Sequence, residues 1–192
     1  MKKILMIIFA MLMTVNVFSQ HLKFMGVPID GNINSFAAKM AAKGFTISPR
    51  NRYTGSGIRV MRGIFFDQSA DIWISYNTTT KIVYSVLVQF YSEDRSVCES
   101  FMKEIKGVIE DKYMYIPETG KTKSGNDIDI YLIVNDEKIY LGQIYIGISE
   151  ATDYFGYYLN LTYEDFQNSE KNDSKKITTY RPCPTYIDDV FC

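Results

Sequence analysis

An alternation of apolar and polar residues along extended segments restricts the fold of this chain more than any other feature. Between residues 82 and 91, Val86, Val88 and Phe90 fall on one side of an extended backbone. Ser85 and Gln89 fall on the other side. A period of two is typical of antiparallel strands that bury one face. Strands are therefore predicted at this segment and at 45–48, 58–67, 70–77, 113–116, 128–134, 139–148 and 156–163.

Two other segments carry apolar residues at the spacing of a helix. In the first, Phe36 and Met40 lie about one turn apart, and Gly44 is suited to end the helix. The second follows Ser92, whose hydroxyl is suited to cap a helix. Its apolar stripe consists of Val97, Phe101, Ile105, Val108 and Ile109, with Cys98 beside it.

The predicted elements follow one another as helix and four strands, then helix and four strands. The two halves also share letters, as in Ser35-Phe36 and Ser100-Phe101. We therefore predict an α+β fold, a tandem repeat of one helix plus a four-stranded antiparallel sheet, with the helices on one face of an extended sheet. The alternative is a single α+β domain whose halves resemble each other by chance.

This organisation divides the chain into four parts. Residues 1–19 are predicted to be a signal peptide and 20–92 the first helix plus four-strand unit. Residues 93–166 are the second such unit, and 167–192 are a flexible linker and C-terminal tail. The linker is expected because the segment 167–176 carries no apolar side chain to bury.

The N-terminal segment has the layout of a secretory signal peptide. Lys2 and Lys3 precede the apolar run Ile4–Met13, and Ser19 is followed by Gln20. The run is only about half as long as a membrane-spanning helix. We therefore expect an exported chain, located in the periplasm or outside the cell, with no membrane span in its mature form.

The net charge and the aromatic content restrict the classes of partner that the chain is expected to bind. Loss of Lys2 and Lys3 takes the formal charge from −1 by two units to −3, and no dense cluster of Lys and Arg remains. Contact with nucleic acid is therefore not expected. Aromatic residues make up 15% of the chain, which favours strands and also recognition surfaces.

The sequence carries no motif of catalysis or of cofactor binding. The one histidine, His21, lies beside the expected cleavage site, where chains are commonly frayed, so it is not expected to act as a general base or metal ligand. Asp127 and Asp129 share one side of a strand, but nothing places them in a cleft. We predict no enzymatic activity, no cofactor and no metal.

The state expected for the cysteines depends on whether the chain is exported to an oxidising compartment. Cys183 and Cys192 lie nine residues apart in the tail, and an oxidising compartment favours a disulfide between them. The alternative is that both thiols are free. Cys98 falls within the second predicted helix and is expected to be a small buried apolar residue.

The side of the predicted sheet that faces away from the helices is rich in aromatic and amide side chains. Tryptophan, tyrosine and arginine are common anchors of interfaces, which favours a binding face. A tyrosine-rich face is also an ordinary way to keep a sheet soluble. The candidate binding residues are Arg59, Trp73, Gln89, Tyr131, Gln143, Tyr145 and Tyr158.

The order of elements over about Asn32–Asp165 resembles the secreted β-lactamase inhibitor proteins and their structural relatives. In that family a long curved sheet carries helices on one side and grips a partner protein with its aromatic-rich concave face. The resemblance implies this architecture and a binding face. It departs in the cysteines, because only Cys98 lies within the predicted repeats, whereas those inhibitors use two short disulfides. Inhibition of a β-lactamase is therefore not carried over.

The leading hypothesis is a non-catalytic interaction protein that binds a protein or peptide through the aromatic face. A second hypothesis is a carbohydrate or small-ligand binding module, in which Trp73 and tyrosines stack on sugar rings. A third is a hydrolase that uses carboxylates alone, and a fourth is a structural subunit of the cell envelope.

Overall fold

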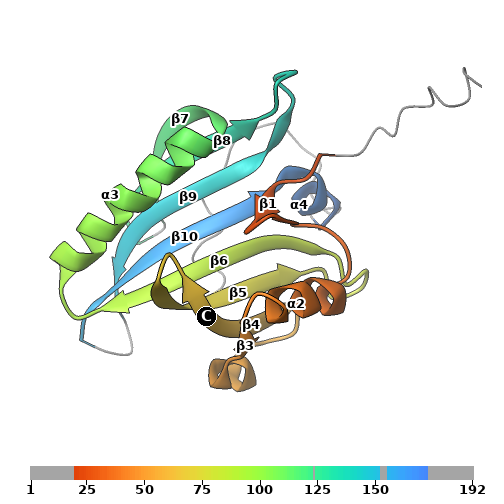
Figure 1. Ribbon diagram of the computed structural model, residues 1–192, viewed down its shortest axis with the longest axis horizontal. Coiled ribbons are helices and arrows are strands. Elements are labelled where there is room, and N and C mark those ends of the chain that lie inside the picture. Colours follow the sequence, from red (N-terminus) through yellow and green to blue (C-terminus); the bar gives the residue numbers. More distant parts are fainter. Residues whose placement is uncertain (1–19, 123, 152–154, 173–192) are drawn as a thin grey trace, which may run out of the picture.

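The computed structural model describes residues 20–122, 124–151 and 155–172, whose arrangement is shown in Figure 1. Eight strands form one antiparallel sheet in the order β3-β4-β5-β6-β10-β9-β8-β7. The hairpin of β1 (Lys23–Phe24) and β2 (Val27–Pro28) forms a second, two-stranded sheet. The strands of the large sheet are β3 (Thr46–Ile47), β4 (Ile58–Phe65), β5 (Gln68–Tyr76), β6 (Val83–Ser92), β7 (Met114–Lys121), β8 (Asp127–Val134), β9 (Tyr140–Glu150) and β10 (Tyr157–Asp165).

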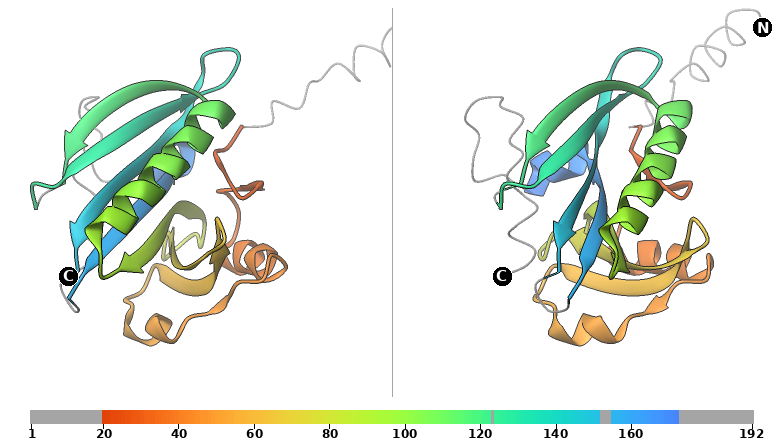
Figure 2. Two further views of the ribbon diagram at one scale, coloured as in Figure 1. Left: turned by 60° about the vertical axis from the view of Figure 1, so that its left-hand side comes forward. Right: turned by 90° about the vertical axis from the view of Figure 1, so that its left-hand side faces the viewer.

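The helices differ in length and in position. They are α2 (Ile33–Ala41), the short 3-10 helix η1 (Pro49–Tyr53), α3 (Arg95–Lys112) and α4 (Phe166–Asn172). Helix α3 lies across one side of the sheet, against β6, β9 and β10, and the β1–β2 hairpin lies on the same side (Figure 2). We call this side the helix face and the other side the opposite face. Within the described ranges, none of the helices combines the length and apolarity that crossing a membrane requires.

The predicted α+β tandem repeat is wrong. The structure is mostly sheet: eight strands form the extended sheet and two more form the β1–β2 hairpin. It does not divide into two helix-plus-four-strand units, because α3 packs against β6 of the first half as well as β9 and β10 of the second. Helix α3 has 18 residues, whereas α2 has nine, so the two halves are not equivalent units. The hairpin β1–β2 and helix α4 are further elements that the prediction lacked.

The main hydrophobic core lies on the helix face and draws on every part of the described chain. Phe36 of α2 and Ile105 of α3 are both almost fully buried in it. Ile72 of β5 and Leu161 of β10 meet them from the sheet. Because one continuous core holds both helices against one sheet, the described residues form a single packing unit.

The alternation of apolar residues predicted the inward side of most strands, but not of β4. Ile72 and Leu161 face the main core, as follows from the predicted placement of Trp73 and Tyr158 on the other side. In β4, Met61 and Phe65 face the core, whereas the predicted placement of Arg59 away from the helices would turn Val60 inward. Apolar residues occupy both parities of this strand, so its period-two pattern does not define which side turns inward.

Helix α3 begins later and buries a narrower stripe than predicted. Asp94, and not Ser92, caps it, because an Asp94 side-chain oxygen accepts a hydrogen bond from the Ser96 amide at 2.8 Å. This hydrogen bond lowers the pKa of Asp94. Val97 and Val108, predicted to face the core, are 55% and 39% exposed.

Helix α4 occupies residues that were predicted to start a flexible linker. Its Asn168 is buried, and the side-chain amide donates to the Ile29 carbonyl at 3.0 Å. The helix is thereby fastened to the N-terminal part of the chain. The predicted signal peptide, 1–19, and the predicted tail from residue 173 onward lie outside the described residues.

Candidate functional site

Most of the predicted binding residues do share the opposite face of the sheet. Trp73, Gln89, Gln143, Tyr145 and Tyr158 alternate along their strands with residues of the main core, and they therefore point away from α3. In the cross-strand register, Gln89 of β6 lies beside Asn160 of β10. Tyr145 lies on β9, so β10 separates it from β6. The sheet thus gathers these five residues from four strands.

Arg59 and Tyr131, in contrast, lie on the helix face, so their assignment to the binding face is wrong. The Arg59 guanidinium donates to the Asn34 side chain of α2 at 3.0 Å. Tyr131 is buried in the main core, and its hydroxyl donates to Glu110 of α3 at 3.1 Å. Burial, followed by this hydrogen bond to Glu110, raises the pKa of Tyr131. Both residues position helices.

The central side chain of the opposite face is Arg50, which the sequence analysis did not select. It lies in η1, where Ser48 caps the helix by accepting a hydrogen bond from the Arg50 amide at 3.3 Å. From there its guanidinium donates to Gln89 at 3.4 Å and to the Tyr158 hydroxyl at 3.3 Å. It also lies 3.5 Å from Asp71 and 5.9 Å from the centre of the Tyr158 ring. No local pattern in the sequence predicts that the Arg50 side chain extends to these residues.

A second arginine fixes the carboxylate that Arg50 contacts. Arg62 of β4 donates two hydrogen bonds to Asp71 of β5, both at 2.8 Å, in the parallel fork geometry that makes arginine–carboxylate pairs strong. Asp71 is only 7% exposed. The hydrogen bond and the charge of Asp71 outweigh partial burial and raise the pKa of Arg62.

Amide side chains continue the same network across the sheet. The Gln89 amide donates to Asn160 at 3.1 Å, and the Asn160 amide donates to Ser149 at 2.9 Å. These bonds link β6, β10 and β9. We call this set the polar network; its members are Arg50, Arg62, Asp71, Gln89, Ser149, Tyr158 and Asn160.

A small apolar cluster adjoins the polar network. Ile128, Ile130 and Tyr145 are buried together on β8 and β9, separately from the main core, and Leu132 packs against them. The Tyr145 hydroxyl donates to Glu164 at 2.9 Å, which ties the cluster to β10. We call these residues the apolar cluster.

The two carboxylates of the opposite face are each held by hydrogen bonds of their own. Asp71 is held by two arginines, and Glu164 accepts hydrogen bonds from Gln143 and Tyr145. The two carboxylates therefore serve separate contacts, whereas acid–base catalysis needs a pair that faces one substrate. Among the described residues, no group of histidine, cysteine and carboxylate side chains has the geometry of a metal site.

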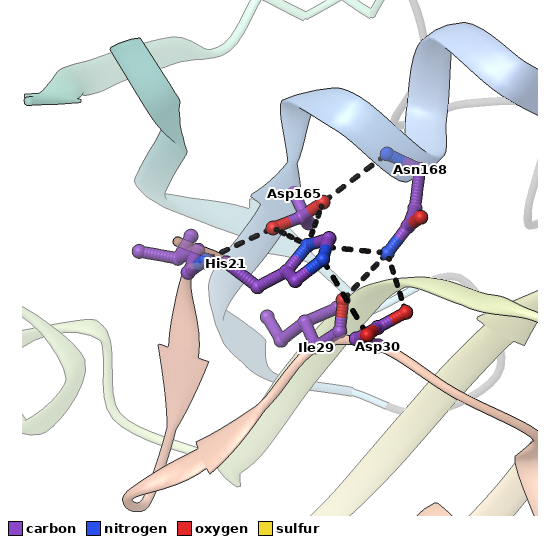
Figure 3. A network of polar contacts seen from close by, with 6 residues as sticks. His21, Ile29, Asp30, Asp165 and Asn168 are labelled. Carbon is purple, nitrogen blue, oxygen red and sulfur yellow. Dashed lines mark hydrogen bonds and ion pairs between the residues drawn. The ribbon is translucent and has the colours of Figure 1, made fainter. Parts of the chain in front are cut away.

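His21 is not frayed, contrary to the expectation from its position in the sequence. Figure 3 shows its ring between two carboxylates, and its side chain is only 10% exposed. Nδ1 lies 3.0 Å from Asp165, and Nε2 lies 3.4 Å from Asp30. Asp165 also accepts hydrogen bonds from the backbone amides of Leu22 and Asn168. This network fixes the N-terminal segment to α4.

The cysteines divide between the described and the undescribed parts of the chain. Cys98 is free and 3% exposed in α3, so the prediction of a buried apolar role is confirmed. Burial raises the pKa of its thiol. The predicted pair Cys183 and Cys192 lies outside the described residues.

Comparison with protein-family models, with curated proteins and with solved structures finds no match to this chain. The interpretation of the opposite face therefore rests on its own geometry.

Proposed function

We propose that this chain is a non-catalytic binding protein that acts outside the cytoplasm after export and holds a protein or peptide partner on the opposite face. The resemblance to secreted inhibitor proteins stays a prediction, and the partner is described only by the chemistry that would recognise it.

The position of Arg50 carries the proposal. Its guanidinium is held between Asp71, Gln89 and Tyr158 and is 30% exposed, so it presents a fixed cation with little rotamer freedom left to lose on binding. Arginine and tyrosine in such preorganised positions are typical anchors of protein interfaces. An aromatic cluster without this network would not distinguish a binding face from an ordinary sheet surface.

The neighbouring residues supply the other parts of an interface. The apolar cluster lies next to the polar network, because Gly147 alone separates Asn160 from Ile128 in the register of the sheet. A polar rim beside a desolvated apolar centre is the usual anatomy of protein interfaces. The exposed guanidinium of Arg62 favours a partner that offers a carboxylate or carbonyl group above β4 and β5.

The experiment compares capture of secreted and envelope proteins by three forms of the chain. The first is the native chain, the second carries Arg50→Ala and Trp73→Ala on the opposite face, and the third carries Lys103→Glu on the exposed side of α3. Circular dichroism and thermal unfolding establish that each variant is folded.

We expect the native chain and the Lys103→Glu variant to capture the same partner. The double variant is expected not to capture it. Binding is then measured between the purified chain and the purified partner. Capture that is equal for all three forms, or that disappears with Lys103→Glu, would contradict the proposal. Binding of free sugars that depends on Trp73, without any captured protein, would favour the carbohydrate hypothesis instead.

A further inference from the structure

A cavity of about 340 Å³ lies on the helix face, on the other side of the sheet from the proposed binding face. It opens to solvent and is bordered by the C-terminal half of α3, the turn between β1 and β2, the turn between β4 and β5, and Tyr163 of β10. Its volume falls within the range of roughly 300–1,000 Å³ that is common for small-molecule sites. Its apolar walls include Phe65, Phe66, Ile105 and Ile109.

Two turns hold bulky apolar residues in an unfavourable backbone conformation at this cavity. Met25, between β1 and β2, has φ of 49°, and Phe66, between β4 and β5, has φ of 50°. Hairpin turns with positive φ normally use asparagine, aspartate or glycine at this position. Both side chains line the cavity. Strained residues of this kind cluster at ligand sites, because the surrounding structure must compensate for them.

Tyr163 supplies a hydroxyl group to the lining of the cavity. Tyr163 of β10 is 6% exposed, and no hydrogen bond joins its hydroxyl to a described residue. Burial, with a smaller contribution from Tyr113, raises the pKa of Tyr163, so the hydroxyl keeps its proton at neutral pH and is a ready donor. A hydroxyl donor in an otherwise apolar lining favours a ligand that carries an acceptor, because the ligand would replace the contact of this donor with water.

The lining of the cavity also includes one lysine. Lys112, the last residue of α3, lines the cavity, and its ammonium lies 5.0 Å from the ring centre of Tyr113. Among the described residues, no carboxylate forms an ion pair with Lys112. The Tyr113 hydroxyl donates to the Lys23 carbonyl at 3.2 Å and keeps this mouth of the cavity closed against the β1–β2 hairpin.

We propose that this cavity binds a small amphipathic carboxylate of the medium-chain fatty acid class. The alkyl chain lies against Phe65, Phe66 and Ile105, and the carboxylate lies at the end where Tyr163 donates a hydrogen bond and Lys112 supplies the positive charge. The site is independent of the opposite face, because the sheet separates the two.

The first test compares three ligands that share one chain and differ in the head group: decanoate, decanol and decylamine, each below the concentration at which it forms micelles. Binding is followed by NMR of the labelled isoleucine methyl groups, among which Ile105 and Ile109 line the cavity. We expect decanoate to shift these two resonances, decanol to bind several-fold more weakly, and decylamine to bind weakest.

The second test uses variants with matched controls. Tyr163→Phe removes one hydroxyl and is expected to weaken decanoate binding about threefold to tenfold, the range of a single hydrogen bond. Lys112→Gln is expected to weaken binding about twofold to fivefold, whereas the exposed control Lys103→Gln leaves it unchanged.

Val108→Trp places a large side chain at the open side of the cavity, and its control is Val97→Trp, which lies on α3 outside the cavity. We expect only Val108→Trp to abolish binding. Equal binding of the three head groups, or decanoate binding that survives both Val108→Trp and Tyr163→Phe, would overturn the proposal. Shifts confined to residues of the opposite face, or no shift of Ile105 and Ile109 by any ligand, would overturn it as well.

Discussion

Nδ1 of His21 lies 3.0 Å from the Asp165 carboxylate, although 144 residues separate the two in the chain. The Asp165 side chain is fully buried, and that of His21 is 10% exposed. The pair therefore joins the first described residues to the end of the last strand, at the point where α4 begins. Figure 3 shows the His21 ring beside Asp165 and Asn168, where the N-terminal segment meets α4.

Removal of the histidine is expected to leave the buried Asp165 side chain without the ring nitrogen that lies 3.0 Å from it. We expect His21→Gln to lower the free energy of unfolding by about 1–3 kcal/mol, the range for a buried polar group that loses a hydrogen-bond partner. Urea denaturation measures this. The control is Asp30→Asn, because Asp30 is 44% exposed and 3.4 Å from His21, and it is expected to cost less than about 1 kcal/mol. A larger loss for Asp30→Asn than for His21→Gln would contradict the assignment.

The pH dependence of stability tests the burial of Asp165. Desolvation by burial raises the pKa of Asp165, although His21 and two backbone amides oppose the rise. The folded chain therefore holds the proton more tightly than the unfolded chain, and the Asp165 contribution to stability is complete below about pH 4 and declines as pH rises through the raised pKa.

In Asp165→Asn this position no longer titrates. We expect the unfolding free energy of the native chain, minus that of the variant, to fall between about pH 4 and pH 7. Urea denaturation at several pH values gives this difference. If this free-energy difference grew with pH, the hydrogen bonds from His21, Leu22 and Asn168 would lower the pKa of Asp165 by more than burial raises it.

Two glycines of ordinary backbone geometry are expected to respond to alanine in opposite directions. A Cβ on Gly63 of β4 would lie 2.6 Å from the ring of the buried Phe45, so Gly63→Ala is expected to destabilise the chain by about 1–3 kcal/mol. A Cβ on Gly107 of α3 meets no atom within 4 Å, so Gly107→Ala is expected to stabilise it by up to about 1 kcal/mol. Thermal unfolding measures both, and a neutral Gly63→Ala would show that the Phe45 ring moves aside easily.

The thiol of Cys98 is expected to be unreactive while the chain is folded. The residue is 3% exposed and burial raises its pKa, whereas alkylation needs an accessible thiolate. The measurement is the rate of labelling with iodoacetamide in a chain that carries Cys183→Ser and Cys192→Ser. Val97→Cys in the same chain is the exposed control and is expected to react on the order of tenfold faster or more. Fast labelling of Cys98 in the native chain would show that the N-terminal half of α3 opens readily.

The sequence predicted local features that depend on one repeating pattern. The alternation around Ile72 and around Leu161 was read correctly, and the stripe containing Ile105 correctly predicted the long helix α3. In β4 the same reasoning failed, because Val60 and Met61 are both buried, on opposite sides of the sheet. Alternation identifies an inward side only where the other side is polar.

The amino-acid sequence alone predicts the extended and helical segments and most of their buried sides, since these follow from the spacing of apolar residues within one segment. The pairing of β6 with β10, the contact of Arg50 with Tyr158 and the contact of His21 with Asp165 emerge only in the folded chain. These contacts join residues far apart in the chain, and no local propensity encodes them. They form because closing the core on the helix face brings distant polar groups together, where burial makes hydrogen-bond partners necessary.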